Sequence, residues 1–275
     1  MFRKALRTGF LAGGVAAATL AAGAAQPAAS PPDFSSNEVG WQQGNGGELN
    51  AVPGVPGPLN TDPRYPFVPN GRGAQPTFRV ADLSTSNLKQ WAKDIMKKDN
   101  DEVVAGKIAY TPGSSCKPAG VPAILLGGGP YFFVQTPKEV VMIVQGDHQV
   151  RHVYMNVSHS KNPRPSWYGE SVGHYEGDTL VIDTIGQSTK TFVDNFRTPH
   201  TDKLHVIERW RMVDDGKQIQ VHITVEDPDT YNQAWQATRN FRRVQTTLQE
   251  FACAENNMNF GLFDYHIPVA DKPDF

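Results

Sequence analysis

The stretch GHYEGDTLVIDTIG, residues 173–186, shows a pattern of polar turn and apolar strand that recurs from about Tyr131 onward. A tight polar turn at Glu176-Gly177-Asp178 is followed by an apolar run of the kind found in β-strands. That run ends on a carboxylate, Asp183. Two interpretations of Asp183 follow: a hydrogen-bonded cap on a strand, or one wall of a reaction site.

From about Tyr131 onward, short runs rich in Val, Ile, Thr and aromatic residues alternate with turn residues. Nine such candidate strands at hairpin spacing, with almost no helix between them, predict an antiparallel meander. The meander is expected to close into a lipocalin-like β-barrel, because closure removes exposed strand edges. The fold class is therefore mainly β, with candidate strands YFFVQ, EVVMIVQ, QVRHVYMN, SVGHY, DTLVIDT, KLHVIERWRM, QIQVHITV, AWQATRNF and TTLQEFAC.

The N-terminus predicts export. Residues 1–29 combine a basic start with small and apolar residues and Ala-rich candidate cleavage sites, which is the layout of a secretory signal peptide. The mature protein is therefore expected to be soluble and either periplasmic or secreted. The chain has two Cys, Cys116 and Cys253. In an oxidising compartment such a pair is more often a disulfide than two free thiols, with two unpaired buried thiols as the alternative.

Two further segments precede the candidate strands. Residues 30–80 are rich in Pro, Gly and Asn, so an extended arm or linker is expected there rather than a regular ladder or helix. STSNLKQWAKDIMKKD, residues 84–99, predicts one amphipathic helix covering an end of the barrel. A single barrel domain that includes this helix is expected over residues 81–275. The apolar face of the helix is predicted to consist of Leu88, Trp91, Ala92 and Ile95.

Composition narrows the partner class. The formal net charge is −2, and no block of Lys and Arg stands out beyond the N-terminus, so a nucleic-acid partner is not expected. No other stretch is apolar for long enough to span a bilayer, so no membrane association is expected after signal cleavage. A small-molecule ligand or substrate remains, and the oligomeric state stays open.

Strand alternation assigns the polar groups to faces. In KLHVIERWRM, residues 203–212, Glu208 shares a face with Leu204 and Trp210. If that face lines the interior, Glu208 is a carboxylate among apolar side chains, where its ionised form needs a cation or a donor. The same alternation places Arg151 opposite His152 and Tyr154, and places His222 on the outer face.

A candidate catalytic constellation follows from these assignments. His200 lies in a loop just before the strand that carries Glu208, and an imidazole can move a proton near neutral pH. Glu208 and Asp183 would orient it or share its proton, and Tyr154 and Arg151 would stabilise developing charge. The expected ligand-binding residues are Trp210, His152 and Tyr175.

Alternatives compete with this hypothesis. Glu208 could pair with an Arg from a neighbouring strand while Asp183 caps a turn. The pattern H-x4-H-x2-E at His200, His205 and Glu208 could bind a metal on a helix, but on a strand His205 and Glu208 point to opposite faces, so no metal is expected. GESVG, residues 169–173, matches a nucleophile motif but lacks the helix that should follow it. No cofactor is expected, since no dinucleotide or phosphate-loop fingerprint is present.

The stretch at 173–186, together with HTDKLHVIERW, VEDPDTY and EFACAEN, resembles a family of secreted bacterial proteins. That family has a G-x-[WY]-E-G-D-T-L-V-[IV]-D-T core followed by H-[ST]-x-x-L-x-[VI]-x-E-R. The resemblance covers about residues 110–256 and implies a similar envelope domain, with Cys116 and Cys253 at the two usual Cys positions. This chain has Tyr175 where Trp is usual, and the resemblance implies no particular activity.

Two functions are therefore expected from the sequence. The first is a secreted enzyme doing cofactor-free acid–base chemistry, as a lyase or dehydratase, an isomerase or a hydrolase, on a small organic substrate in a barrel cavity. The alternative is a non-catalytic periplasmic protein that binds or carries a small ligand, because barrels of this type host both roles.

Overall fold

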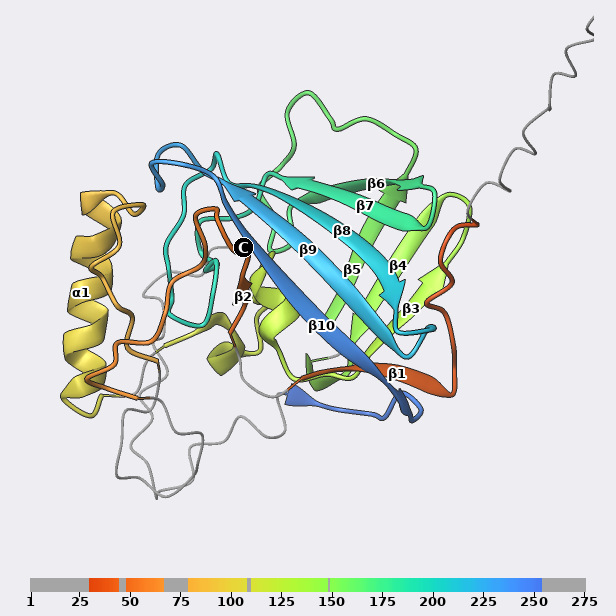
Figure 1. The fold of residues 1–275 in the computed structure, drawn as a ribbon, viewed down its shortest axis with the longest axis horizontal. Coiled ribbons are helices and arrows are strands. Elements are labelled where there is room, and N and C mark those ends of the chain that lie inside the picture. The colour runs from red at the N-terminus through yellow and green to blue at the C-terminus, as the bar shows by residue number, and fades with distance from the viewer. Residues whose placement is uncertain (1–29, 45–47, 67–78, 108–109, 148, 254–275) are drawn as a thin grey trace, which may run out of the picture.

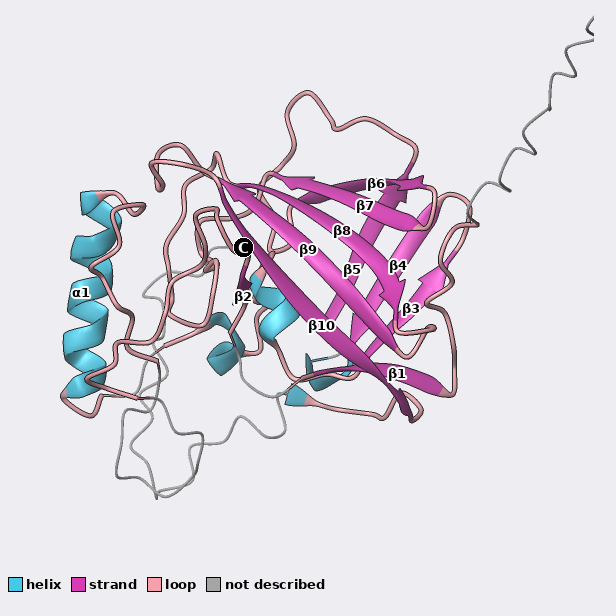
Figure 2. Ribbon diagram, viewed as in Figure 1, coloured by secondary structure: helices cyan, strands magenta, loops and turns pink. Residues whose placement is uncertain are grey.

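A computed structural model describes residues 30–44, 48–66, 79–107, 110–147 and 149–253 and shows a closed β-barrel with one α-helix beside it (Figures 1 and 2). The strand order is β1-β3-β4-β5-β6-β7-β8-β9-β10, and β10 pairs with β1 to close a nine-stranded ring of the lipocalin-like kind expected. The elements are β1 (Val39–Gln43), β2 (Asn50–Ala51), α1 (Gln90–Val104), β3 (Tyr131–Gln135), β4 (Glu139–Val144), β5 (Gln149–Met155), β6 (Glu170–Glu176), β7 (Thr179–Ile185), β8 (His205–Val213), β9 (Gln218–Glu226) and β10 (Trp235–Gln245), with 3-10 turns at Pro112–Ser115, Ala123–Leu126 and Gln145–Asp147.

The barrel is mixed rather than wholly antiparallel. β5 and β6 run parallel, with Val153 opposite Ser171, whereas the other neighbours in the ring are antiparallel. A parallel pair needs a long connection, and residues 156–169 supply it as the loop that arches over β6 and β7 (Figure 1). β6 and β7 are then joined by a two-residue turn in which Gly177 has a φ of +60°, a conformation that favours glycine.

The strand that closes the barrel comes from the segment expected to be an arm. Eight of the nine candidate strands form, but TTLQEFAC, residues 246–253, is not a strand. β1 takes its place and aligns with β10 from Val39 opposite Gln245 to Gln43 opposite Phe241. VGWQQ contains no Pro, and its Trp41 is 1% exposed, so this part of the arm has both the free N–H groups and the apolar anchor that a strand needs.

Large side chains fill the interior between these strands. Trp210 of β8 contacts Phe133 of β3 at 5.5 Å between ring centroids and Phe241 of β10 at 5.8 Å, and Phe241 contacts Tyr131 at 4.9 Å. Ile219, Val221, Ile223 and Val225 of β9 add the apolar face that alternation predicts. This part of the barrel is therefore a packed core.

The helix lies to one side of the barrel, with loop segments between it and the strands (Figure 1), and its buried face differs from the expected one. It begins at Gln90, and its buried residues are Ala92, Met96, Asn100 and Val103. Trp91 and Ile95, expected on the apolar face, are 37% and 45% exposed. The Asn100 amide exchanges two hydrogen bonds with the backbone of Ala81, and the Trp91 indole N–H donates to the Asp229 carbonyl at 2.7 Å. These polar contacts set the rotation of the helix, which hydrophobic spacing alone does not determine.

Cys116 and Cys253 form a disulfide, with their Cα atoms 5.7 Å apart. Disulfides are typical of oxidising compartments, which agrees with the expected export. Residues 1–29, on which the signal-peptide prediction rests, lie outside the described part of the chain. Within the described part, no helix has the length and apolar character required to cross a bilayer.

The disulfide gives a first prediction. It joins residues 137 positions apart, so its removal frees a long loop in the unfolded chain, and the chain-entropy relation gives a loss of about 4–5 kcal/mol in the free energy of unfolding. Urea unfolding of the Cys116→Ser/Cys253→Ser protein, compared with the oxidised wild type, measures it. An unchanged free energy of unfolding would contradict the constraint.

Candidate functional site

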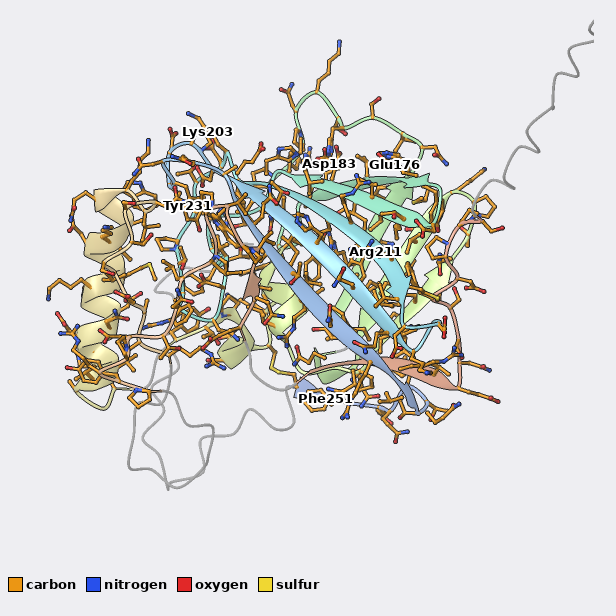
Figure 3. The ribbon with its side chains drawn as sticks, in the orientation of Figure 1. Glu176, Asp183, Lys203, Arg211, Tyr231 and Phe251 are labelled. Carbon is orange, nitrogen blue, oxygen red and sulfur yellow. A yellow bond between two sulfur atoms is a disulfide. The ribbon has the colours of Figure 1, made fainter. Side chains whose placement is uncertain are left out.

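Asp183 lies in the middle of a cluster of ionisable side chains on the outer face of the barrel. It belongs to β7, and its Oδ1 atom is 2.9 Å from Nε2 of His159 and 2.9 Å from Nε2 of His205. His205 starts β8 and His159 comes from the loop 156–169. The three side chains are 38%, 21% and 29% exposed, so solvent and small molecules reach them. Figure 3 places Asp183 at the edge of the barrel beside β6 and β7.

Each imidazole also contacts a second carboxylate, through its Nδ1 atom. Nδ1 of His159 is 3.0 Å from Glu170 of β6, and Nδ1 of His205 is 3.2 Å from Glu226 of β9. An ionised carboxylate can only accept hydrogen bonds, so each of the four contacts needs a proton on its imidazole nitrogen. With ionised carboxylates, both rings are then imidazolium ions. The five side chains, named the Asp183 cluster here, carry a net charge of −1 in that state and −3 when both rings are neutral.

The local environment shifts several pKa values in the cluster. Burial would raise the pKa of Asp183, but hydrogen bonds from His205 and His159 outweigh it and hold that pKa below its usual value. The hydrogen bond to Asp183 raises the pKa of His205 above its usual value, against the effect of burial. The Ser160 hydroxyl, 2.6 Å from Glu170, is the main cause that lowers the pKa of Glu170. Asp183 is thus ionised and His205 is biased toward its charged form.

A cleft of about 360 Å³ is lined by residues that lie close in sequence to Asp183, His159 and His205, although none of the five cluster residues is itself part of the lining. Ile185 lies two residues after Asp183 on the same face of β7, Leu204 directly precedes His205, and Pro163 belongs to the same loop as His159. Lys203 is also part of the lining, but its ammonium group is paired with Asp229 at 2.7 Å (Figure 3). Mostly apolar walls beside partly exposed acid and base groups are typical of small-molecule sites.

Glu208 and Arg151 lie on the opposite side of the sheet from Asp183, in the barrel interior. Both side chains are 0% exposed, and the Arg151 guanidinium donates to both oxygens of Glu208, at 3.1 and 2.5 Å. It also donates to the hydroxyls of Ser171 and Thr184. The alternation prediction for Glu208 is confirmed, including the cation that its burial requires. The pair spans the barrel from β5 to β8.

His200 belongs to a third place in the structure. It is 4% exposed, its Nδ1–H donates to the Thr201 carbonyl at 2.8 Å, and Thr191 contacts its Nε2 at 2.8 Å. Burial lowers the pKa of His200, which favours the neutral ring. The expected convergence of His200, Glu208 and Asp183 is therefore wrong, because the three side chains occupy a buried loop, the barrel interior and the outer surface.

The other four predicted site residues do not lie together either. Tyr154 and His152 point outward from β5, where Tyr154 is 50% exposed and His152 meets Glu139 at 2.5 Å. Trp210 is a core residue in the barrel, and the Tyr175 hydroxyl accepts a hydrogen bond from Gln135 at 2.8 Å. No described contact brings these four side chains to one site.

The structure also bears on the metal site and the nucleophile motif that were considered from the sequence. Among the described residues, no group of three or more His, Cys, Asp or Glu is arranged to hold a metal ion. His205 and Glu208 point to opposite faces, as expected for a strand. Ser171 of GESVG is 2% exposed within β6 and bonds Arg151, so it is part of a strand rather than a nucleophile elbow.

Sequence reasoning missed His159, Glu170 and Glu226. His159 lies in the loop that follows β5, outside any strand pattern, and only the fold brings it to Asp183. A signal was present in β7, β8 and β9, because Asp183, His205 and Glu226 all fall on outward-facing positions, with His205 directly opposite Glu226. Following the outer face as well as the inner one would have found those three.

No protein-family model, curated protein or solved structure matches the chain. The family resemblance of the sequence motifs therefore stays a prediction, and the site has to be interpreted from its own geometry.

The buried pair gives a second prediction. Removing one partner in Glu208→Leu or Arg151→Met leaves an uncompensated polar group in the core, which costs about 3–5 kcal/mol in the free energy of unfolding. The double substitution should lose much less than the sum of the two, because both charges are gone. Urea unfolding of the four proteins measures this coupling, and additive losses would show that the pair does not act as a unit.

The Asp183 cluster gives a third prediction, on pH. His205 has a raised folded pKa, so its contribution to stability is complete below about pH 6.5 and is lost as pH rises through that pKa. Asp183 has a lowered folded pKa, so its contribution is complete above about pH 3.8 and is lost in stronger acid. Asp183→Asn should therefore destabilise the protein more at pH 5 than at pH 9.

Urea unfolding at the two pH values tests this. His222→Gln is the matched control, because His222 is an imidazole on the outer face of the neighbouring strand β9. An equal loss for Asp183→Asn at both pH values would refute the charge coupling.

Proposed function

We propose that the protein is a secreted enzyme that performs cofactor-free acid–base chemistry on a small organic substrate, and that the Asp183 cluster is its proton-transfer site. One observation carries this proposal: Asp183 Oδ1 lies 2.9 Å from two imidazole nitrogens at a partly exposed surface. A protonated imidazole donates a proton to a reacting group, and after losing it the same ring accepts one.

The surrounding carboxylates support the two roles. Asp183 Oδ1 holds both Nε2 atoms in one place, and the two Nδ1 atoms contact Glu170 and Glu226, so a ring exchanges a proton with a substrate only when one of these four contacts opens. Glu170 and Glu226 hold the orientation of the two rings through their Nδ1 atoms, and Glu226 favours the charged form of His205. One imidazolium acting as acid and one neutral imidazole acting as base would suit elimination, isomerisation or hydrolysis.

The cleft, rather than the barrel interior, is the proposed place of the substrate. The aromatic side chains of Trp210, Phe133 and Phe241 occupy the interior, whereas the cleft is lined by residues close in sequence to the cluster. Arg151 and Glu208 then support the barrel, and their contribution to turnover is indirect. The alternative of a carrier without turnover requires the same cleft to bind a ligand and release it unchanged.

The fourth prediction tests the enzyme proposal. Two probes are used: 5-nitrobenzisoxazole, which reacts when a base removes a carbon-bound proton, and p-nitrophenyl acetate for hydrolysis. Wild type should accelerate at least one of them, and Asp183→Asn and His205→Gln should each reduce that rate by roughly 100-fold or more. His222→Gln should keep the wild-type rate.

Two results would count against the proposal. Wild-type rates in both Asp183→Asn and His205→Gln would show that the cluster moves no proton. Tight binding of the intact probes without turnover by wild type would favour the carrier.

A further inference from the structure

The outer face of β8, β9 and β10 is an open part of the barrel surface. β8 and β9 have nine residues each and β10 has eleven, so they are the longest strands that the structure describes. The loop 156–169 arches over β6 and β7, but no described segment crosses β8 to β10 on the outside (Figure 1). Nine residues in a strand span about 30 Å. This face therefore has room for an extended ligand.

The strand register brings three Arg side chains onto this face. Arg209 and Arg211 lie two residues apart on β8, a separation of about 7 Å. Arg211 is aligned with Gln220 of β9, Gln220 is aligned with Asn240 of β10, and Arg242 comes two residues later. Two strand spacings and two residue steps place Arg242 roughly 12 Å from Arg211. All three Arg are exposed, and the outward positions between them are Gln218, Gln220, His222, Thr238 and Asn240.

Carboxylates balance only part of this positive charge. Arg209 is paired with Glu176 of β6 at 2.5 Å, whereas the Arg211 guanidinium donates to the neutral amide oxygen of Gln220 at 2.8 Å (Figure 3). Within the described ranges, no Asp or Glu forms an ion pair with Arg211 or Arg242. The whole chain has a formal net charge of −2, so this excess of positive charge is local and does not follow from a basic composition.

We propose that this surface, named the arginine face here and consisting of Arg209, Arg211, Arg242 and the five outward residues between them, binds a linear polysaccharide that carries carboxylate groups. A guanidinium can donate two parallel hydrogen bonds to one carboxylate. The amide, hydroxyl and imidazole groups between the Arg side chains both donate and accept, as the hydroxyl groups of sugar rings do. Asp214 and Asp215, exposed in the turn after β8, repel an anionic chain and so bound the arginine face at that end.

Two observations favour a polysaccharide over a nucleic acid. Sites for single-stranded nucleic acids combine basic groups with aromatic side chains on which the bases stack, and the eight residues of the arginine face include no Phe, Tyr or Trp. The disulfide between Cys116 and Cys253 is typical of oxidising compartments, where acidic polysaccharides are available. This proposal goes beyond the proposed function, because it involves none of the five side chains of the Asp183 cluster.

The fifth prediction measures binding of two polymers that differ in charge. Polygalacturonate carries a carboxylate on each ring, and its fully methyl-esterified form has the same backbone without the charge. In isothermal titration calorimetry with the full chain, polygalacturonate should bind at least roughly tenfold more tightly than the ester. Arg211→Gln/Arg242→Gln should weaken the binding of polygalacturonate by roughly tenfold or more, because two charged donors are lost.

Lys98→Gln/Lys138→Gln is the matched control. It makes the same change in net charge at exposed positions of α1 and of the turn before β4, and it should bind polygalacturonate as wild type does. Three results would overturn the proposal: equal binding of the two polymers, undiminished binding by Arg211→Gln/Arg242→Gln, or an equal loss in the lysine control. Single-stranded DNA is the third probe, and an affinity equal to that for polygalacturonate would refute the assignment to a polysaccharide.

Discussion

Closure of the sheet by β1 and β10 is the constraint on which the rest of the structure depends. Once the ring is closed, each strand has one face toward the barrel interior and one face toward the outside, and the alternation of the strand assigns each side chain to one of the two faces. In the interior, a charged group is tolerated only when it is paired, as Glu208 is by Arg151. Groups that exchange protons with a substrate need access to it, so the outer face is where they can work.

The neighbouring strands β7 and β8 show this division within a few residues. Ile182 is aligned with Glu208 and faces inward, and Asp183 is aligned with Ile207 and faces outward. Two carboxylates from adjacent strands therefore have different environments. Glu208 has a guanidinium and no solvent, and Asp183 has two imidazoles and partial exposure. The first arrangement stabilises a barrel, and the second can gain and lose protons.

Much of the barrel is predictable from the sequence, because strand alternation is a local property. It places Glu208 inside and His222 outside, and it predicts β3 to β10. Two features of the structure do not follow from strand alternation. Val39–Gln43 lies among Pro and Gly residues and becomes a strand only because β10 is there to pair with it. His159 belongs to no periodic pattern, so its contact with Asp183 depends on where the loop 156–169 crosses the sheet. His200, chosen for its place before β8, is instead held by Thr191 and Thr201 inside its own loop.

The two strands that close the ring, β1 and β10, are far apart in the sequence. β1 has a single aligned pair with β3, Trp41 opposite Tyr131, and depends mainly on β10. During synthesis, β1 emerges about two hundred residues before its partner, and the strands between them form a growing sheet with an open edge. The disulfide also forms only after β10 has been made, because Cys253 follows β10 in the sequence. The barrel therefore closes only after β10 has been made, and until then its exposed edge has to be kept from pairing with other chains.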